Sequence, residues 1–235
     1  MKAIFKREVR SYFSSPVGYV CVAALMALYG FYYYQAMLSS SSSYISAVFS
    51  TMFTFSMMII PIITMRSMTD DQKNKTDQAL LTAPVGVTSI VLGKFFACCC
   101  VYFIATTLGG ILPALAMSTF SSPAWGEIIG TYIGALLYGA AMISIGVFIS
   151  SLTKSQIIAA IGTFIISVVL MFVDSLASAI SNEFVSKIVQ WLSFNERYST
   201  FTQSMFSTSS VLFFVSVAAV FVFLTARKVE SRRWS

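Results

Sequence analysis

The stretch IVLGKFFACCCVYFIATTLGGILPALAM, residues 90–117, carries one charged side chain, Lys94, in an otherwise apolar run. As an α-helix rising 1.5 Å per residue it is about 42 Å long, more than the roughly 30 Å of a bilayer's hydrocarbon core. Five further apolar stretches of spanning length occur in the chain. The predicted spans are Val17–Met37, Ala47–Met65, Ile90–Met117, Ile128–Leu152, Ile157–Ala179 and Val211–Ala226. We therefore predict an all-α membrane protein with six transmembrane helices.

The composition supports a membrane protein and leaves no room for a second domain. Hydrophobic residues make up 57% of the 235 residues and charged residues only 10%, whereas a soluble domain has about 25% charged residues. No connection between predicted spans exceeds roughly 30 residues, which is too short for a soluble catalytic or nucleotide-binding domain. We predict a single transmembrane domain covering residues 1–235.

Several kinds of chemistry are excluded by residue types and motifs that the sequence lacks. It contains no histidine, which removes imidazole metal ligands and Ser-His or Cys-His nucleophilic machinery. The four cysteines, Cys21 and the run 98–100, fall inside predicted spans without a C-x-x-C motif, so we interpret them as packing residues. No G-x-x-x-x-G-K-[ST] loop occurs. We therefore expect a chain that binds no metal or cofactor and does not hydrolyse ATP.

Lysine and arginine are distributed unevenly between the two sides of the predicted bundle. With a cytoplasmic N-terminus, every Lys and Arg except Lys187 and Arg197 lies in or beside a cytoplasmic segment. Cytoplasmic loops of membrane proteins carry such an excess, so both termini are predicted to be cytoplasmic. The net charge of +6 then reflects topology, and no nucleic-acid partner is expected. Lys94, one turn from the membrane edge, is expected to snorkel to that interface.

Residues 1–14 form a basic segment ahead of the first span. Its apolar positions at helical spacing are Phe5, Val9, Tyr12 and Phe13, and its basic positions are Lys2, Lys6, Arg7 and Arg10. This pattern is typical of an amphipathic helix lying in the cytoplasmic interface against anionic lipid. Pro16 is expected to end the helix before the first span. The alternative is a merely basic juxtamembrane tail.

The segment 66–89 contains the pattern of a helix start. Thr69 and Gln72 have the spacing of a capping box, in which the side chain of each residue accepts a hydrogen bond from the backbone N–H of the other. The spacing also predicts the ion pairs Asp70 with Lys73 and Asp71 with Lys75. A short cytoplasmic helix is therefore predicted to begin at Thr69.

The predicted loop helix has an apolar end. It runs through Asp77, Leu80 and Leu81 and must stop by Ala83, because Pro84 disfavours a helical residue before it. A charged beginning and an apolar end suit insertion into a groove on a cytoplasmic partner. A solvated connector with ordinary caps is the alternative.

Between the fifth and sixth spans, residues 180–210 are too long for a simple turn. An apolar stripe at helical spacing is formed by Val185, Ile188, Val189 and Leu192. It predicts a helix on or dipping into the outer leaflet, an interfacial or re-entrant segment that either covers a substrate path or only anchors the chain.

A few residues inside the predicted spans suggest special roles. Asp174 is an acidic residue in the fifth span, which places it either on a translocation path or within reach of interfacial water. Gly130 and Gly134 form a G-x-x-x-G that allows close packing with a neighbour, within the chain or in a dimer. Pro61 and Pro113 are candidate kinks.

Two blocks of the sequence carry a family resemblance. The first is Phe5, Lys6, Arg7, Glu8, Tyr12, Phe13, Ser15 and Pro16, and the second is Thr64, Met65, Arg66, Asp70, Asp71, Thr76, Leu80, Leu81, Thr82, Ala83, Pro84, Gly93 and Lys94. Together with the six-span topology they resemble the permease subunits of ABC-2 type transporters, and among them the gliding-motility and nitrous-oxide-reductase accessory permeases. The chain departs from that pattern with Asp-Asp in place of Glu-Glu, with Lys75 in place of a glycine, and with Ala79 in place of a common glutamate.

The resemblance implies a permease subunit, most simply an exporter, of the bacterial plasma membrane. It implies a second permease subunit and a separately encoded ABC ATPase that binds ATP and Mg²⁺ and docks on the cytoplasmic loop 66–89. The implied docking residues are Thr69, Asp70, Asp71, Lys73, Thr76, Asp77, Leu80 and Leu81, beside the N-terminal helix with Phe5, Lys6, Arg7, Arg10, Tyr12 and Phe13. The alternative is a non-transporting membrane scaffold or immunity protein that uses its outer segment.

Overall fold

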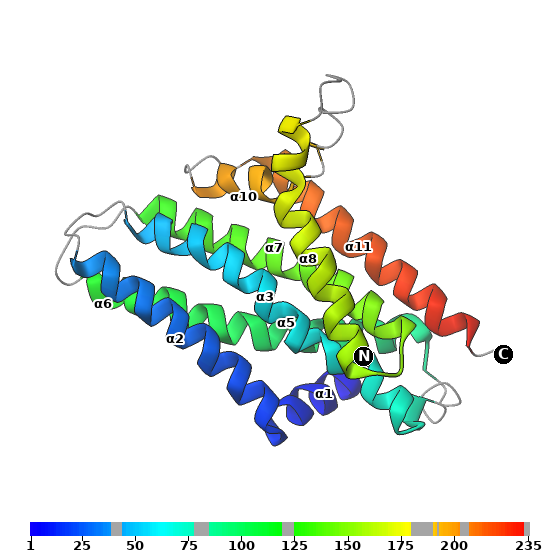
Figure 1. Cartoon of the computed structure of the whole chain (residues 1–235). Helices are drawn as coiled ribbons and strands as arrows, with labels where there is room; N and C mark the ends of the chain where they lie inside the picture. The colour runs from blue at the N-terminus through cyan, green and yellow to red at the C-terminus, as the bar shows by residue number, and fades with distance from the viewer. Residues whose placement is uncertain are drawn as a thin grey trace.

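A computed structural model describes residues 1–38, 44–77, 85–118, 125–179, 190–191, 193–202 and 207–232 (Figure 1). These residues are helical apart from short connections, and the described part of the chain contains no strand. The elements in chain order are α1 (Lys2–Ser14), α2 (Pro16–Leu38), α3 (Tyr44–Lys73), α5 (Val87–Thr106), η1 (Thr107–Ile111), α6 (Leu112–Met117), α7 (Trp125–Leu152), α8 (Gln156–Ala179), α10 (Phe194–Thr202) and α11 (Thr208–Ser231).

In the part of the chain that it describes, the structure confirms the prediction of six helices long and apolar enough to cross a membrane. They are α2, α3, the continuous run from α5 through α6, α7, α8 and α11. Helix α7 lies at the centre, because α3, α5, α8, α10 and α11 all pack against it, and 67% of its most apolar window is buried. In α2, α8 and α11 less than a third of that window is buried, so these helices form the outside of the bundle.

Glycines along α7 let its neighbours approach closely. Gly139 lies against the ring of Tyr102 on α5, and Gly146 lies against the side chain of Thr64 on α3. Gly134 lies under the ring of Phe201, where an added Cβ would be 2.8 Å from Cγ. The predicted G-x-x-x-G packing therefore takes place within the chain, against α10 rather than another spanning helix.

Helix α10 is built into the core by aromatic side chains. Its buried residues Phe194, Tyr198 and Phe201 share one face. The Tyr198 ring stacks on Phe53 of α3 at 4.8 Å, and its hydroxyl donates to the Phe49 carbonyl at 3.2 Å. This ordered helix lies in the predicted outer segment, but the stripe proposed for that segment (Val185, Ile188, Val189 and Leu192) lies outside the described residues.

Helix α1 ends where the sequence predicts. Ser15 is extended, with φ −112° and ψ 154°, and Pro16 begins α2. The predicted helix over the N-terminal segment is therefore confirmed. Its apolar face packs on α5 and α2, so its buried residues Ile4 and Tyr12 contact protein.

Helix α3 is longer than predicted, and the capping box at Thr69 is wrong. The helix continues from the membrane span to Lys73 without interruption and is about 45 Å long. Thr69 lies inside it, and its hydroxyl donates to the Met65 carbonyl one turn earlier. The N–H groups that a capping residue would satisfy are already bonded within a continuous helix, so the local motif has no function here. The chain leaves the helix at Lys75, which has a positive φ of 57°.

The third span changes its hydrogen-bonding pattern before Pro113. Residues Thr107–Ile111 form a π-helical turn with Gly109 and Gly110 buried in it. The ring of Tyr29 lies so close to Gly109 that an added Cβ would be 2.8 Å from Cδ2. This π-helical turn accommodates aromatic side chains of α2 and α3, while the kink expected at Pro113 stays a prediction. Pro61, by contrast, lies within the uninterrupted α3.

Candidate functional site

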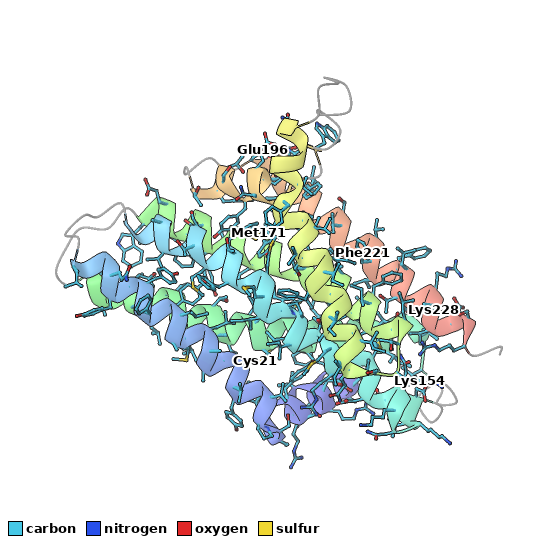
Figure 2. All side chains as sticks on the ribbon, viewed as in Figure 1. Cys21, Lys154, Met171, Glu196, Phe221 and Lys228 are labelled. Carbon is cyan, nitrogen blue, oxygen red and sulfur yellow. The ribbon has the colours of Figure 1, made fainter. Side chains whose placement is uncertain are left out.

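A polar cavity of about 330 Å³ lies where α1, the end of α3 and the start of α5 meet. The C-terminal end of α11 comes to the same end of the bundle, where the Arg232 guanidinium donates to the Ser151 carbonyl on α7. We call this end the basic end; Figure 2 shows Lys154 and Lys228 there, with Glu196 at the opposite end. The cavity is lined by Arg7, Glu8, Ser11, Tyr12, Arg66, Asp70, Asp71, Asn74, Thr76 and Lys94.

Two contacts hold α1 against the bundle beside this cavity. Gly93 on α5 lies under Ile4, where an added Cβ would be 3.0 Å from Cγ2. Tyr12 is buried, and its hydroxyl donates to the Ile63 carbonyl of α3 at 2.7 Å and lies 3.3 Å from the Cys98 thiol of α5. Burial raises the pKa of the Tyr12 phenol well above its ordinary value, so the hydroxyl stays protonated as a donor.

Four charged side chains form a neutral group that we call the ion cluster: Arg7, Glu8, Asp71 and Lys94. The Lys94 ammonium lies 2.5 Å from Asp71 Oδ2 and 3.2 Å from Glu8 Oε1, and it donates to the Ser67 carbonyl at 2.6 Å. Arg7 lies 2.5 Å from Glu8 and 3.2 Å from Asp71 on the solvent side. One cation from α5 and one from α1 thus balance one carboxylate from α1 and one from α3.

The expected snorkelling of Lys94 is wrong. Its side chain is only 3% exposed, because α1 lies across it and supplies Glu8 as a partner. An ammonium buried to this extent needs both charge compensation and hydrogen bonds, and the cluster supplies both. Lys94 therefore belongs to the protein interior and not to the lipid interface.

The ion pairs predicted along the loop helix are also wrong. Asp70 pairs with Arg66 one turn earlier at 3.0 Å and accepts from the Gln156 amide of α8. Asp71 pairs with Arg7 and Lys94 instead of Lys75. The reason is that α3 ends before Lys75, so residues 71 and 75 do not share a helix face.

The turn after α3 is hydrogen-bonded to the ion cluster. The Thr76 hydroxyl donates to Asp71 Oδ1 at 2.7 Å, and residues 76 and 77 are helical. Lys73, Asn74 and Lys75 are exposed. The apolar end of the predicted loop helix, Leu80 and Leu81, lies outside the described residues.

Gln72, which sequence reasoning assigned to a capping box, ties α3 to α7. Its amide donates to the Ser150 and Ser151 carbonyls, each at 3.4 Å. The Met68 N–H donates to the Ser150 hydroxyl at 3.0 Å. The end of α3 is thus held on one side by α7 and on the other by the ion cluster.

The predicted site residues divide into internal and exposed groups. The buried or half-buried ones are Thr69, Asp70, Asp71, Asp77, Phe5, Tyr12 and Phe13, and the exposed ones are Lys73, Thr76, Lys6, Arg7 and Arg10. Glu8 and Lys94 were not predicted as site residues. Each carried a signal, because Glu8 is the one acid of a basic segment and Lys94 the one charge of an apolar stretch. The side chain of Asp174 lies outside the described residues.

The arrangement is better suited to connecting helices mechanically than to catalysing a reaction. Among the residues that the structure describes, no group of three or more His, Cys, Asp or Glu side chains is arranged to hold a metal ion. Gly93 and Lys94 do not form a phosphate-binding loop, since Gly93 packs under Ile4 and the Lys94 ammonium is bonded inside the ion cluster. The site instead joins three helices that are far apart in the sequence.

Comparison with known proteins agrees with this fold. No curated protein matches the sequence. Residues 2–229 match the family model described as ABC-2 family transporter protein. That range includes α1, the ion cluster and the six apolar helices except for the last two residues of α11. The chain therefore belongs to the ABC-2 family of transporter proteins.

Proposed function

We propose that the protein is the permease subunit of an ABC-2 transporter and works as an exporter. The observation that carries this proposal is the family match over residues 2–229 of a chain whose described part is little more than six apolar helices and α1. We propose that energy comes from a separately encoded ABC ATPase that binds ATP and Mg²⁺, and that a second permease subunit completes the path. The gliding-motility and nitrous-oxide-reductase accessory permeases are the subgroup that the sequence resembles.

The proposed orientation puts the basic end in the cytoplasm of a bacterium, with the chain in the plasma membrane. Lys154 and Lys228 lie at the basic end (Figure 2), and Arg7 of α1 lines the cavity there. Arg197 belongs to α10, near the opposite end. An excess of Lys and Arg on one side is typical of the cytoplasmic side. Both termini would then be cytoplasmic.

The proposed docking surface is the turn after α3 together with α1. Lys73, Asn74, Lys75 and Thr76 are exposed in the turn, and Arg7 connects it to α1 through its contact with Asp71. Asp71 supports this surface from the interior, because its carboxylate accepts a hydrogen bond from Thr76 and pairs with Lys94 in the ion cluster. An ATPase that binds this turn would act on α3 and α1 at once.

Charge reversal in the exposed turn tests this docking. The variant Lys73→Glu/Lys75→Glu changes two exposed side chains without touching the ion cluster. Lys154→Glu changes an exposed lysine at the same end between α7 and α8 and serves as the matched control. Affinity purification from the native cell in mild detergent, with mass spectrometry and an ATPase assay, gives the readout.

The outcomes separate the proposals. We expect an ABC ATPase to be recovered with the parent chain and the Lys154→Glu control, and to be lost or strongly reduced with the double reversal. Equal recovery with all three chains would place the docking surface elsewhere. A parent chain that recovers no ATPase would contradict the permease proposal and favour a non-transporting scaffold or immunity protein.

A further inference from the structure

We propose that Lys94 is the positioning residue that couples the ATPase-docking turn to the membrane helix α5. This inference rests on the proposed function and deepens it, because it names the side chain through which movement of the turn would reach the transmembrane bundle. Lys94 acts through the two carboxylates that it holds.

Lys94 of α5 bonds to groups on both α1 and α3. Its ammonium bonds to Glu8 on α1, to Asp71 on α3 and to the Ser67 carbonyl on α3, at 3.2, 2.5 and 2.6 Å. Asp71 in turn accepts from Thr76 in the exposed turn at 2.7 Å. A displacement of α1 would therefore act on the Lys94 side chain through Glu8, and a displacement of the turn would act on it through Asp71.

Burial makes the Lys94 connection stiff. Lys94 is 3% exposed, Glu8 12% and Asp71 15%, so protein atoms cover most of each side chain although the cluster borders the polar cavity. A buried charge that separates from its partner is strongly penalised, whereas an exposed pair exchanges with solvent cheaply. The pair Arg227 with Glu230, exposed at 66% and 48%, is an example of the second kind. The Lys94 bonds are therefore expected to persist while the helices that carry them move.

Helix α5 is suited to pass such a movement on to the rest of the bundle. It packs against α1, α2, α3, α7 and α11, and its Tyr102 ring fits into the space left by Gly139 of α7. Within the same span it continues into the π-helical turn Thr107–Ile111, where the hydrogen-bonding pattern shifts. Packed helices transmit small shifts as whole bodies, and π-helical turns are frequent at functional positions.

A purely structural role for Lys94 is the competing explanation, and a neutral double variant separates the two. Lys94→Met/Glu8→Gln removes one positive and one negative charge, so Arg7 and Asp71 remain as a balanced pair and Asp71 keeps its hydrogen bond from Thr76. Methionine keeps most of the buried volume. This variant is expected to fold and to bind the ATPase, but it lacks the ionic connection between α3 and α5.

The experiment measures nucleotide-driven movement on the far side of the π-helical turn. The four native cysteines are replaced by alanine, and Leu112, which is 51% exposed on α6, is changed to cysteine and labelled with bimane. Fluorescence is recorded on the complex with the ATPase, without nucleotide and after trapping with ATP, Mg²⁺ and vanadate. Lys94→Arg keeps the charge, and Lys154→Met removes an exposed lysine as a matched control.

The inference predicts a nucleotide-driven fluorescence change in the labelled parent, in Lys94→Arg and in Lys154→Met. In Lys94→Met/Glu8→Gln the change is expected to fall by about fivefold or more, the lower range of typical coupling between two sites, while ATPase recovery is unaffected. An undiminished change in the double variant would overturn the inference and leave the proposed function standing. A labelled parent that binds an active ATPase without any change would also overturn it. Failure to recover an ATPase with the parent would overturn the proposed function itself.

Discussion

Replacing Lys94 with methionine is the perturbation whose energetic consequence follows most directly from the structure. The substitution leaves Glu8 and Asp71 buried at 12% and 15% exposure with one cation fewer. Breaking a buried ion pair by removing one partner costs about 3 to 5 kcal/mol. Because Arg7 still contacts both carboxylates, at 2.5 and 3.2 Å, the lower end of that range applies. We expect the free energy of unfolding to fall by about 3 kcal/mol, which raises the unfolding equilibrium constant about 150-fold.

A double-mutant cycle assigns this loss to the ion cluster. Asp71→Asn alone leaves Lys94 with one carboxylate, and the combination Lys94→Met/Asp71→Asn restores a balanced pair. We therefore expect the double variant to unfold within about 1 kcal/mol of the parent, which gives a large coupling free energy between the two positions. Lys154→Met, at an exposed position of the same end, should stay within about 0.5 kcal/mol.

The assay is reversible unfolding of the purified chain in mixed micelles of a mild detergent and SDS, followed by circular dichroism. Each variant is measured at the same protein concentration and lipid content, because dimerisation would shift the midpoint. If Lys94→Met unfolds within about 0.5 kcal/mol of the parent, Lys94 is not held in a buried cluster, and the reasoning on its role fails.

Three further predictions concern packing and protonation. Gly139→Leu forces a side chain into the Tyr102 ring and should destabilise by about 1 to 3 kcal/mol in the same unfolding assay, whereas Gly126→Ala meets nothing within 4 Å and should be neutral or slightly stabilising. Tyr12→Phe removes the buried hydrogen bond to the Ile63 carbonyl and should cost about 1 kcal/mol at pH 7. Burial raises the pKa of Tyr12, so its contribution is complete below the unfolded value of about 10 and is lost as the pH rises further. The stability of the parent should therefore approach that of Tyr12→Phe above about pH 10, and a difference that stays constant or widens would contradict the buried assignment.

The spans were predictable because length and hydropathy are local properties. Each predicted stretch corresponds to one of the six apolar helices. The end of α1 was predictable for the same reason, since Pro16 restricts its neighbour directly. The glycines of α7 were recognisable as packing positions, but nothing local identified Phe201 as the partner of Gly134.

The ion cluster was not predictable, because its members come from three helices. Lys94, Asp71 and Glu8 meet only once α1 lies across α3 and α5, and the sequence gives no sign of that crossing. The local patterns at residues 69–75 suggested a capped helix with its own ion pairs. The structure replaces them with a helix that continues to Lys73 and with partners from α1, α5 and α8. Tertiary contacts overrode a valid local motif.

The most direct test of the central claim is native mass spectrometry of the complex purified through this chain from its own cell. The account predicts an assembly that contains two permease subunits, at least one of them this 25.8 kDa chain, together with two copies of an ABC ATPase, and that hydrolyses ATP. An assembly that contains this chain alone, or with partners that do not bind nucleotide, would contradict it.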